Sequence, residues 1–205
     1  AQLVLASIAW TEAMLDQLCF IHGEFAPESS FSFYAHDYLV QASAGGHARY
    51  FERRGRDELA LKCAAQGMKS MLAAPHLEIF NLMVRLKRLP PPGARKLAKQ
   101  KGHRDVAAAF RDLDKRLADL ETREPLTSRH KTWLKSLRKV TFVPDAEMTK
   151  NLGRLVMRNP LRPQRKEEID RQCAESERSD PAHQAARSLC EMAGLRLGGL
   201  KAVGA

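Results

Sequence analysis

The sequence predicts an all-α protein: a single compact domain of about eight helices, without significant sheet. Apolar residues recur at helical spacing along most of the chain, Pro and Gly separate these segments, and no stretch shows sustained alternation with period two. A chain of 205 residues buries roughly 70% of its unfolded surface, so a substantial core is available. Because aromatic residues make up only 6% of the chain, we expect a core built mainly from Leu, Ala, Val and Met.

Four helices are expected in the first half of the chain, residues 1–89. Ser, Asp or Pro residues lie near several of their starts, where caps and proline are favoured, and Gly or Pro follows most of their ends. These helices are Leu3–His22, Phe31–Ala44, Asp57–Leu72 and His76–Leu89, with a short helical piece after Gly46. The apolar start of the first helix lacks a basic flank and is followed by Glu12 and Asp16, so neither a signal peptide nor a membrane span is expected.

Pro90-Pro91-Pro92-Gly93 interrupts the helical pattern. Residues 90–102 are expected to form a basic Pro/Gly connector to a second, basic helical half at 103–205. The next helix has the most regular pattern, because five apolar residues repeat at 4-3-4-3 spacing from Val106 to Leu120. Further helices are expected at Thr127–Val140, Asp145–Asn159, Gln164–Arg178 and Ala182–Ala193.

The net charge of +10 is unevenly distributed. Residues 1–90 carry nine basic and nine acidic side chains, so the whole excess lies in residues 91–205, with 25 Lys or Arg against 15 Asp or Glu. This asymmetry favours an acidic protein or a nucleic acid as the partner of the second half; a solvated surface that keeps the protein soluble is the alternative. The four cysteines are widely spaced and form no C-x-x-C pair, which favours a reducing cytoplasm.

The sequence contains no G-x-S-x-G, P-loop, G-x-G-x-x-G or H-E-x-x-H motif, so we expect a non-enzymatic protein without a cofactor. His47 has the most site-like position of the histidines. A histidine packed at a helix junction is the favoured interpretation, and an enzyme pocket near His36, His47 and Tyr50 is the competing one. Cys19 and His22 lie one helical turn apart, but two ligands are too few for a structural zinc, so no metal site is expected.

The stretch Ser32–Phe51 begins as an amphipathic helix, stops at Gly45-Gly46 and continues at once with His47. Two adjacent glycines permit a sharp turn or the close approach of another element. The N–H groups that start the following helix would suit an anion; the alternative is a tight crossing of two helices. The crossing is favoured, because apolar residues flank the glycines and no Lys or Ser follows them as in a phosphate loop.

Two of the expected helices display cations opposite their apolar faces. The candidate partner- or nucleic-acid-binding residues are Lys131, Lys135, Arg138 and Lys139 on Thr127–Val140, and Lys150, Arg154 and Arg158 on Asp145–Asn159. Coplanar stripes would contact several phosphates or an acidic protein surface, and a solvated helix face is the alternative. No aromatic residue is interleaved with the cations, which disfavours base stacking with single strands.

The segment Gln41–Phe51, QASAGGHARYF, resembles a motif of the DNA-mimic-protein family, whose C-terminal domain type occurs in many bacterial proteins. The matching residues are Gly45, Gly46, Tyr50, Phe51 and Gly55. Gly67 stands where the family's next helix ends in a small-residue turn, and the resemblance covers about residues 1–90.

This resemblance implies an all-helical fold, no enzymatic activity and a homodimer as one assembly. A DNA mimic needs a dense negative surface, whereas this chain has a net charge of +10. Gln41, Ala44, His47 and Arg49 also stand where the motif has Glu, Asn, Phe and Gln. We therefore expect the fold to carry over without the mimicry. The predicted function is binding of a protein or acidic partner through the basic second half; direct nucleic-acid binding by the same face is the alternative.

Overall fold

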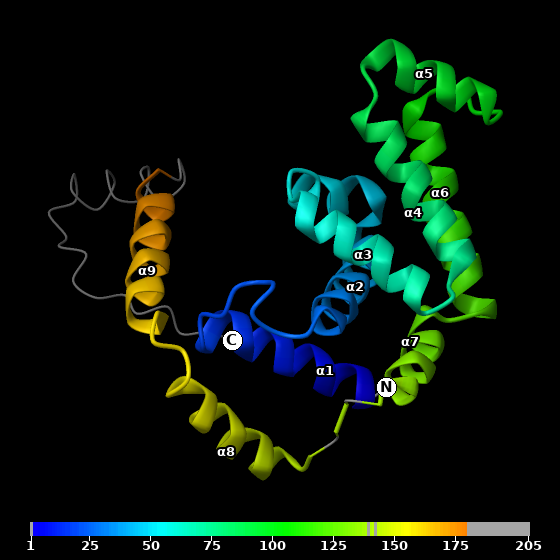
Figure 1. The fold of residues 1–205 in the computed structure, drawn as a ribbon. Coiled ribbons are helices and arrows are strands. Elements are labelled where there is room, and N and C mark those ends of the chain that lie inside the picture. Colours follow the sequence, from blue (N-terminus) through cyan, green and yellow to red (C-terminus); the bar gives the residue numbers. More distant parts are fainter. Residues whose placement is uncertain (1, 139, 142, 180–205) are drawn as a thin grey trace, which may run out of the picture. The chain divides into compact units, whose positions relative to one another are not determined.

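The computed structural model describes residues 2–138, 140–141 and 143–179 (Figure 1). All regular structure in these residues is helical, which confirms the predicted all-α fold. Contacts divide the chain into two compact units, residues 1–154 and 155–205, and each is considered by itself. The grouping of all residues into one domain stays a prediction, and the helix expected at Ala182–Ala193 lies outside the described residues.

The first unit contains most of the helices. They are α1 (Gln2–Glu12), α2 (Pro27–Arg54), α3 (Glu58–Ser70), α4 (Ala74–Arg88), α5 (Pro91–Gln100), α6 (Val106–Arg123) and α7 (Leu126–Ser136). Helix α8 (Asp145–Val156) reaches the boundary between the units, and α9 (Arg162–Ser179) belongs to the second unit. Asp57 and Asp105 cap α3 and α6, since their carboxylates accept hydrogen bonds from the N–H groups of Ala60 and Ala108.

The first helix is shorter than expected. It ends at Glu12 and widens into one π-helical turn, Ala13–Gln17, instead of continuing to His22. The chain then turns through Cys19, whose φ of 53° is left-handed, and this turn buries the Cys19 side chain. A helix that continued past Gln17 would not make this turn, so the early stop serves core packing.

The expected connector at residues 90–102 is instead largely helix α5. Proline is tolerated in the first turn of a helix, where its missing N–H removes no hydrogen bond, so Pro91 and Pro92 begin α5 rather than prevent it. Ala94, Leu97 and Ala98 form its buried face. In the sequence, only the helical spacing of these small and apolar residues indicates α5, because cations separate them.

The core of the first unit lies where α2 packs against α3 and α6, and where α4 packs against α6. Tyr38, Tyr50 and Phe80 are fully buried there, with ring centroids 5.0–6.2 Å apart in edge-on arrangements. Gly67 of α3 lies against the Phe31 carbonyl of α2, where a Cβ atom would clash with it. A glycine at this position therefore allows α2 and α3 to approach closely.

A smaller apolar cluster joins α1 to α7. Val4 and Ile8 of α1 pack with Leu134 of α7, and Leu137 is partly buried against them. None of the described helices is long and apolar enough to cross a membrane.

Candidate functional site

The paired glycines lie at a kink inside α2. Gly46 has φ 77° and ψ 169°, a conformation that interrupts the helix and that side chains other than glycine rarely adopt. A Cβ atom on Gly46 would also lie 2.9 Å from a carboxylate oxygen of Asp114 in α6. The expected tight crossing of two helices is therefore present, and its second helix is α6.

At the same kink, His47 binds a carboxylate of the protein itself, that of Asp114. The backbone N–H of His47 donates to Asp114 Oδ1 over 2.8 Å, and the His47 ring nitrogen Nδ1 lies 2.5 Å from the same oxygen. The other ring nitrogen, Nε2, is 2.8 Å from the Tyr38 hydroxyl. With Asp114 ionised, Nδ1–H donates to the carboxylate and Nε2 accepts from the hydroxyl. The N–H of His47 is therefore used by a carboxylate of this chain, and the crossing is the interpretation that the structure supports.

This Tyr38–His47–Asp114 chain of hydrogen bonds is buried. Tyr38 and His47 are both 0% exposed, although the Asp114 side chain is 38% exposed. Burial lowers the pKa of His47, and the hydrogen bond and charge of Asp114 oppose this effect only in part. Burial also raises the pKa of Tyr38 well above its usual value. Because neither the Tyr38 hydroxyl nor the His47 ring is accessible from the surface, the geometry favours a structural role.

The other residues of the glycine motif are also part of the core. Tyr50 is 0% exposed, and burial is the main cause that raises its pKa. Phe51 is half-buried, with the Lys87 ammonium 5.9 Å from its ring centroid. Gly46 thus lies against α6, and Tyr50 and Phe51 contact Phe80 and Lys87 of α4, whereas a Cβ atom on Gly45 would meet only the Arg49 side chain of α2 itself.

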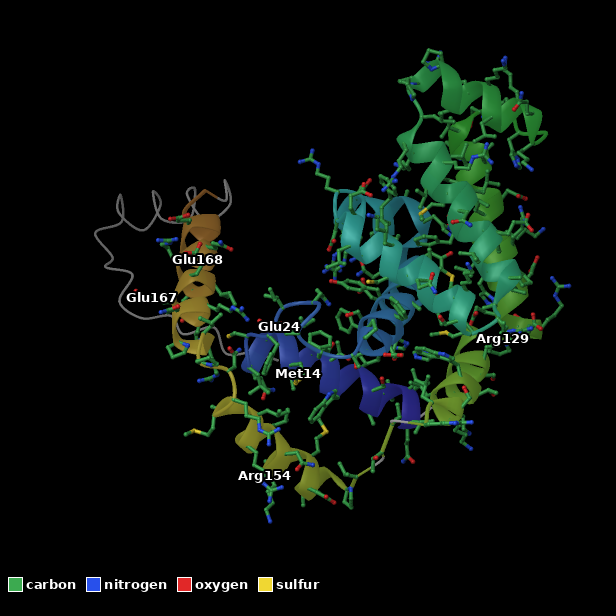
Figure 2. The ribbon with its side chains drawn as sticks, in the orientation of Figure 1. Met14, Glu24, Arg129, Arg154, Glu167 and Glu168 are labelled. Carbon is green, nitrogen blue, oxygen red and sulfur yellow. The ribbon has the colours of Figure 1, made fainter. Side chains whose placement is uncertain are left out.

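The predicted cationic stripes are shorter than expected. Helix α7 ends at Ser136, because the chain becomes extended at Leu137, which packs against the α1–α7 cluster. Lys131 and Lys135 are exposed on α7, whereas Arg138 follows the helix and Lys139 lies outside the described residues. Lys150 and Arg154 are exposed on α8, and Arg154 extends from that helix in Figure 2, but Arg158 lies beyond its end at Val156. Neither stripe is a continuous helical row, and partner binding by these residues stays a prediction.

A denser group of cations surrounds α5. From Ile79 to Arg104, both included, the chain has eight Lys or Arg residues and no Asp or Glu. Arg88 pairs with Glu58, Arg104 pairs with Asp105, and Lys87 lies over the rings of Phe51 and Phe110. The others have no ion pair in the described part of the chain and are exposed: Arg85, Arg95, Lys96, Lys99 and Lys101. We call these five residues the α5 cation patch. A comparison of the net charges of residues 1–90 and 91–205 does not reveal the α5 cation patch, because its members lie on both sides of residue 90.

An open pocket of about 570 Å³ lies at the opposite end of α4 and α6. One wall is the turn between α3 and α4, with Met71 and Leu72, and the other is α7, with Arg129 and Trp133. Arg129 is labelled in Figure 2, near the junction of α6 and α7. These walls are more than fifty residues apart in sequence, so local patterns gave no signal for the pocket. We call it the Leu72–Trp133 groove.

A metal site is not evident in the described residues, where no three His, Cys, Asp or Glu side chains are grouped to hold an ion. Cys19 and Cys63 are buried, and Cys63 is a free thiol. These observations leave the kinked α2, the α5 cation patch and the Leu72–Trp133 groove as the distinctive features of an all-helical scaffold built around a double glycine.

Comparison with known families agrees with this description. The model of the DMP19-like protein family matches residues 23–137, and the chain belongs to this family. No curated protein and no solved structure matches the chain. The matched region extends from the loop before α2 to the end of α7, so it begins later and ends much later than the expected residues 1–90. It therefore includes the α5 cation patch and the Leu72–Trp133 groove.

The matched region is itself basic. Residues 23–137 hold 21 Lys or Arg and 13 Asp or Glu, a net charge of +8. A surface of this sign attracts phosphates and carboxylates and repels the cationic surfaces that bind DNA. The fold of the family is thus present here with a charge unsuited to imitating DNA.

Proposed function

We propose that this chain is a non-enzymatic interaction protein that binds an acidic protein partner through exposed cations on its helices. The α5 cation patch is the observation that carries the proposal. Its five unpaired cations are exposed on α4, on α5 and just after α5, where the buried face of α5 packs against α4 and α6. Surface charges held in fixed positions and free of internal ion pairs steer and orient an oppositely charged protein.

The absence of catalytic activity is part of this proposal. Tyr38 and His47, the best candidates for acid–base chemistry, are buried among core side chains. A location in the reducing cytoplasm is also proposed, supported by the buried free thiol of Cys63 and by the absence of a C-x-x-C pair from the sequence.

Direct nucleic-acid binding is the second candidate, supported by the same cations. An acidic protein is favoured, because residues 85–101, which hold the α5 cation patch, contain no aromatic residue for base stacking. Double-stranded nucleic acid, which needs only phosphate contacts, is the form of this alternative to be tested.

The proposal is tested by affinity capture from cell extract with and without nuclease, followed by mass spectrometry. The double variant Lys96→Glu/Lys99→Glu reverses two charges of the α5 cation patch. The variant Lys62→Glu/Lys115→Glu makes the same charge change at exposed helical positions elsewhere. We expect one acidic protein to be recovered by the wild type and by the control variant, with nuclease present, and to be lost with Lys96→Glu/Lys99→Glu. Recovery that nuclease abolishes would favour the nucleic-acid alternative, and equal recovery by all three proteins would exclude the patch.

A further inference from the structure

The Leu72–Trp133 groove has an unusual backbone at its edge. Helix α3 ends with the Ala73 N–H bonded to the Met68 carbonyl over 2.9 Å and the Leu72 N–H bonded to the Lys69 carbonyl over 3.1 Å. This is the Schellman pattern, in which the residue at the position of Leu72 is left-handed and is usually glycine. Leu72 occupies it with φ 55°. Leucine is unfavourable in this left-handed conformation, so the backbone gives no reason for a leucine at position 72.

The Leu72 side chain is not used in the core. It is 78% exposed, whereas its neighbours Met71 and Ala73 are 3% and 0% exposed. Across the groove, the Trp133 side chain is half-buried and lines the α7 wall. An exposed leucine and a partly exposed tryptophan that line the same concave surface are typical of a protein-binding site, where tryptophan is enriched among the anchor residues.

Arg129 gives the groove a positively charged rim. One of its terminal nitrogens donates to the Leu72 carbonyl over 2.9 Å, and the other donates to the Glu124 carboxylate. A guanidinium has five N–H donors, so Arg129 retains donors for a further acceptor. The nearby Arg123 is exposed on the same rim. Two arginines against one carboxylate, which is already paired, make the rim complementary to a carboxylate of a partner.

The walls of the groove are held in place before any partner binds. The Glu121 carboxylate of α6 accepts from the His76 ring over 2.7 Å and from the Leu126 N–H over 2.9 Å. It therefore ties the starts of α4 and α7 to one point on α6. A surface that is fixed in advance loses little entropy on binding.

We propose that the Leu72–Trp133 groove binds an acidic amphipathic segment of a partner protein, with Leu72 and Trp133 contacting its apolar side chains and Arg129 one of its carboxylates. The proposal rests on the proposed function only in taking the partner to be a protein. Its site is separate from the α5 cation patch, because the two lie at opposite ends of α4, whose 15 residues span about 22 Å.

The test uses Leu72→Gly in the full chain. Glycine is preferred at a left-handed helix end, so this variant removes the anchor while keeping or raising the thermal unfolding temperature. The matched control is Leu59→Ala, which truncates an exposed leucine at the other end of α3. A Trp10→Phe background leaves Trp133 as the one tryptophan of the chain, so its fluorescence reports binding at the groove.

The probe is a short synthetic peptide with Glu and Leu at helical spacing, compared with versions that carry Lys for Glu or Ala for Leu. We expect the Glu/Leu peptide to shift the Trp133 emission, and both altered peptides to bind at least about tenfold more weakly. Leu72→Gly should lower the affinity for the Glu/Leu peptide by a similar factor. Leu59→Ala and Lys96→Glu/Lys99→Glu should change this affinity by no more than about twofold, which distinguishes the groove from the α5 cation patch.

Three results would overturn the proposal. The first is equal affinity of wild type and Leu72→Gly for the Glu/Leu peptide, or no binding of that peptide at all. The second is a marked fall in the unfolding temperature of Leu72→Gly, which would give Leu72 a structural role. The third is self-association of the wild type that Leu72→Gly abolishes, which would make a second copy of this chain the occupant.

Discussion

Gly46 is the residue at which α2 changes direction, and its two roles are physically distinct. Its positive φ suits the backbone at the kink, and its missing Cβ leaves room for the Asp114 carboxylate. The carboxylate then accepts from the N–H and the ring of His47, which begin the second part of the helix. The kink therefore depends on one residue that permits it and on one that stabilises it.

Gly46→Ala is expected to lower the free energy of unfolding by about 2 kcal/mol or more, because alanine is strained at this φ and crowds Asp114. Chemical denaturation measures this change. The control is Gly153→Ala in α8, where an added Cβ meets no atom within 4 Å. That variant should leave the stability unchanged or raise it by up to about 1 kcal/mol. Equal effects of the two variants would contradict the role given to the kink.

Buried histidines make the stability of the fold depend on pH. Burial, reinforced by the nearby charge of His36, lowers the pKa of His130 from 6.5 to about 4, and its ring bonds to the Ser32 hydroxyl over 2.7 Å. Below pH 6.5 the unfolded chain therefore binds a proton that the folded His130 does not. Stability that is complete above pH 6.5 is lost as the pH falls towards 4, by about 3 kcal/mol from His130 alone.

His130→Gln should reduce this loss, as measured by urea unfolding at pH 7 and at pH 4. His103→Gln is the control, because His103 lies near the surface and contacts Asp112 at 3.8 Å. We expect His103→Gln to retain the pH dependence of the wild type. A pH dependence that is the same in all three proteins would show that His130 is not its source.

At the scale of helices, the sequence predicts elements well where local rules decide. The expected helices at Asp57–Leu72 and His76–Leu89 differ by one or two residues at each end from α3 and α4, because a capping Asp and an N-terminal proline define their starts. The regular apolar spacing from Val106 to Leu120 likewise predicted the helix that the structure shows at Val106–Arg123. Helix α5 was missed, because three prolines were interpreted as a break rather than as a helix start.

The candidate binding surfaces could be predicted less well from the sequence, because they depend on distant contacts. The glycine pair indicated a crossing, but Asp114 lies 67 residues beyond His47. The left-handed Leu72 could not be predicted, since leucine rarely adopts that conformation. Prediction of the groove and of the patch would require the tertiary arrangement, in which α5 packs against both α4 and α6 and α7 lies beside the α3–α4 turn.

The cations of α7 and α8 are distinguished from those of α5 by a second charge reversal. Lys135→Glu/Arg154→Glu with preserved fold is expected to weaken the partner complex, most visibly at low salt, if the predicted stripes contribute. Lys96→Glu/Lys99→Glu changes the charge by the same amount. A larger loss with the α5 variant would locate the main contact there, and indifference of every partner to Lys135→Glu/Arg154→Glu would exclude the stripes.

At the scale of the molecule, the family membership and the net charge indicate different binding properties. The chain belongs to the DMP19-like protein family over residues 23–137, yet that region carries a net charge of +8. Its helices place the α5 cation patch at one end of α4 and the Leu72–Trp133 groove at the other. A partner that uses both would need acidic surface for the first and an acidic amphipathic segment for the second.

The central claim is tested most directly by the affinity of the purified chain for the protein partner recovered in the presence of nuclease. The dissociation constant is measured at low and at physiological salt, for the wild type and for Lys96→Glu/Lys99→Glu. We predict tighter binding by the wild type, an affinity that falls as salt rises, and a smaller salt dependence in the variant. Identical affinities of both proteins at both salt concentrations would contradict the proposal that the α5 cation patch binds an acidic protein.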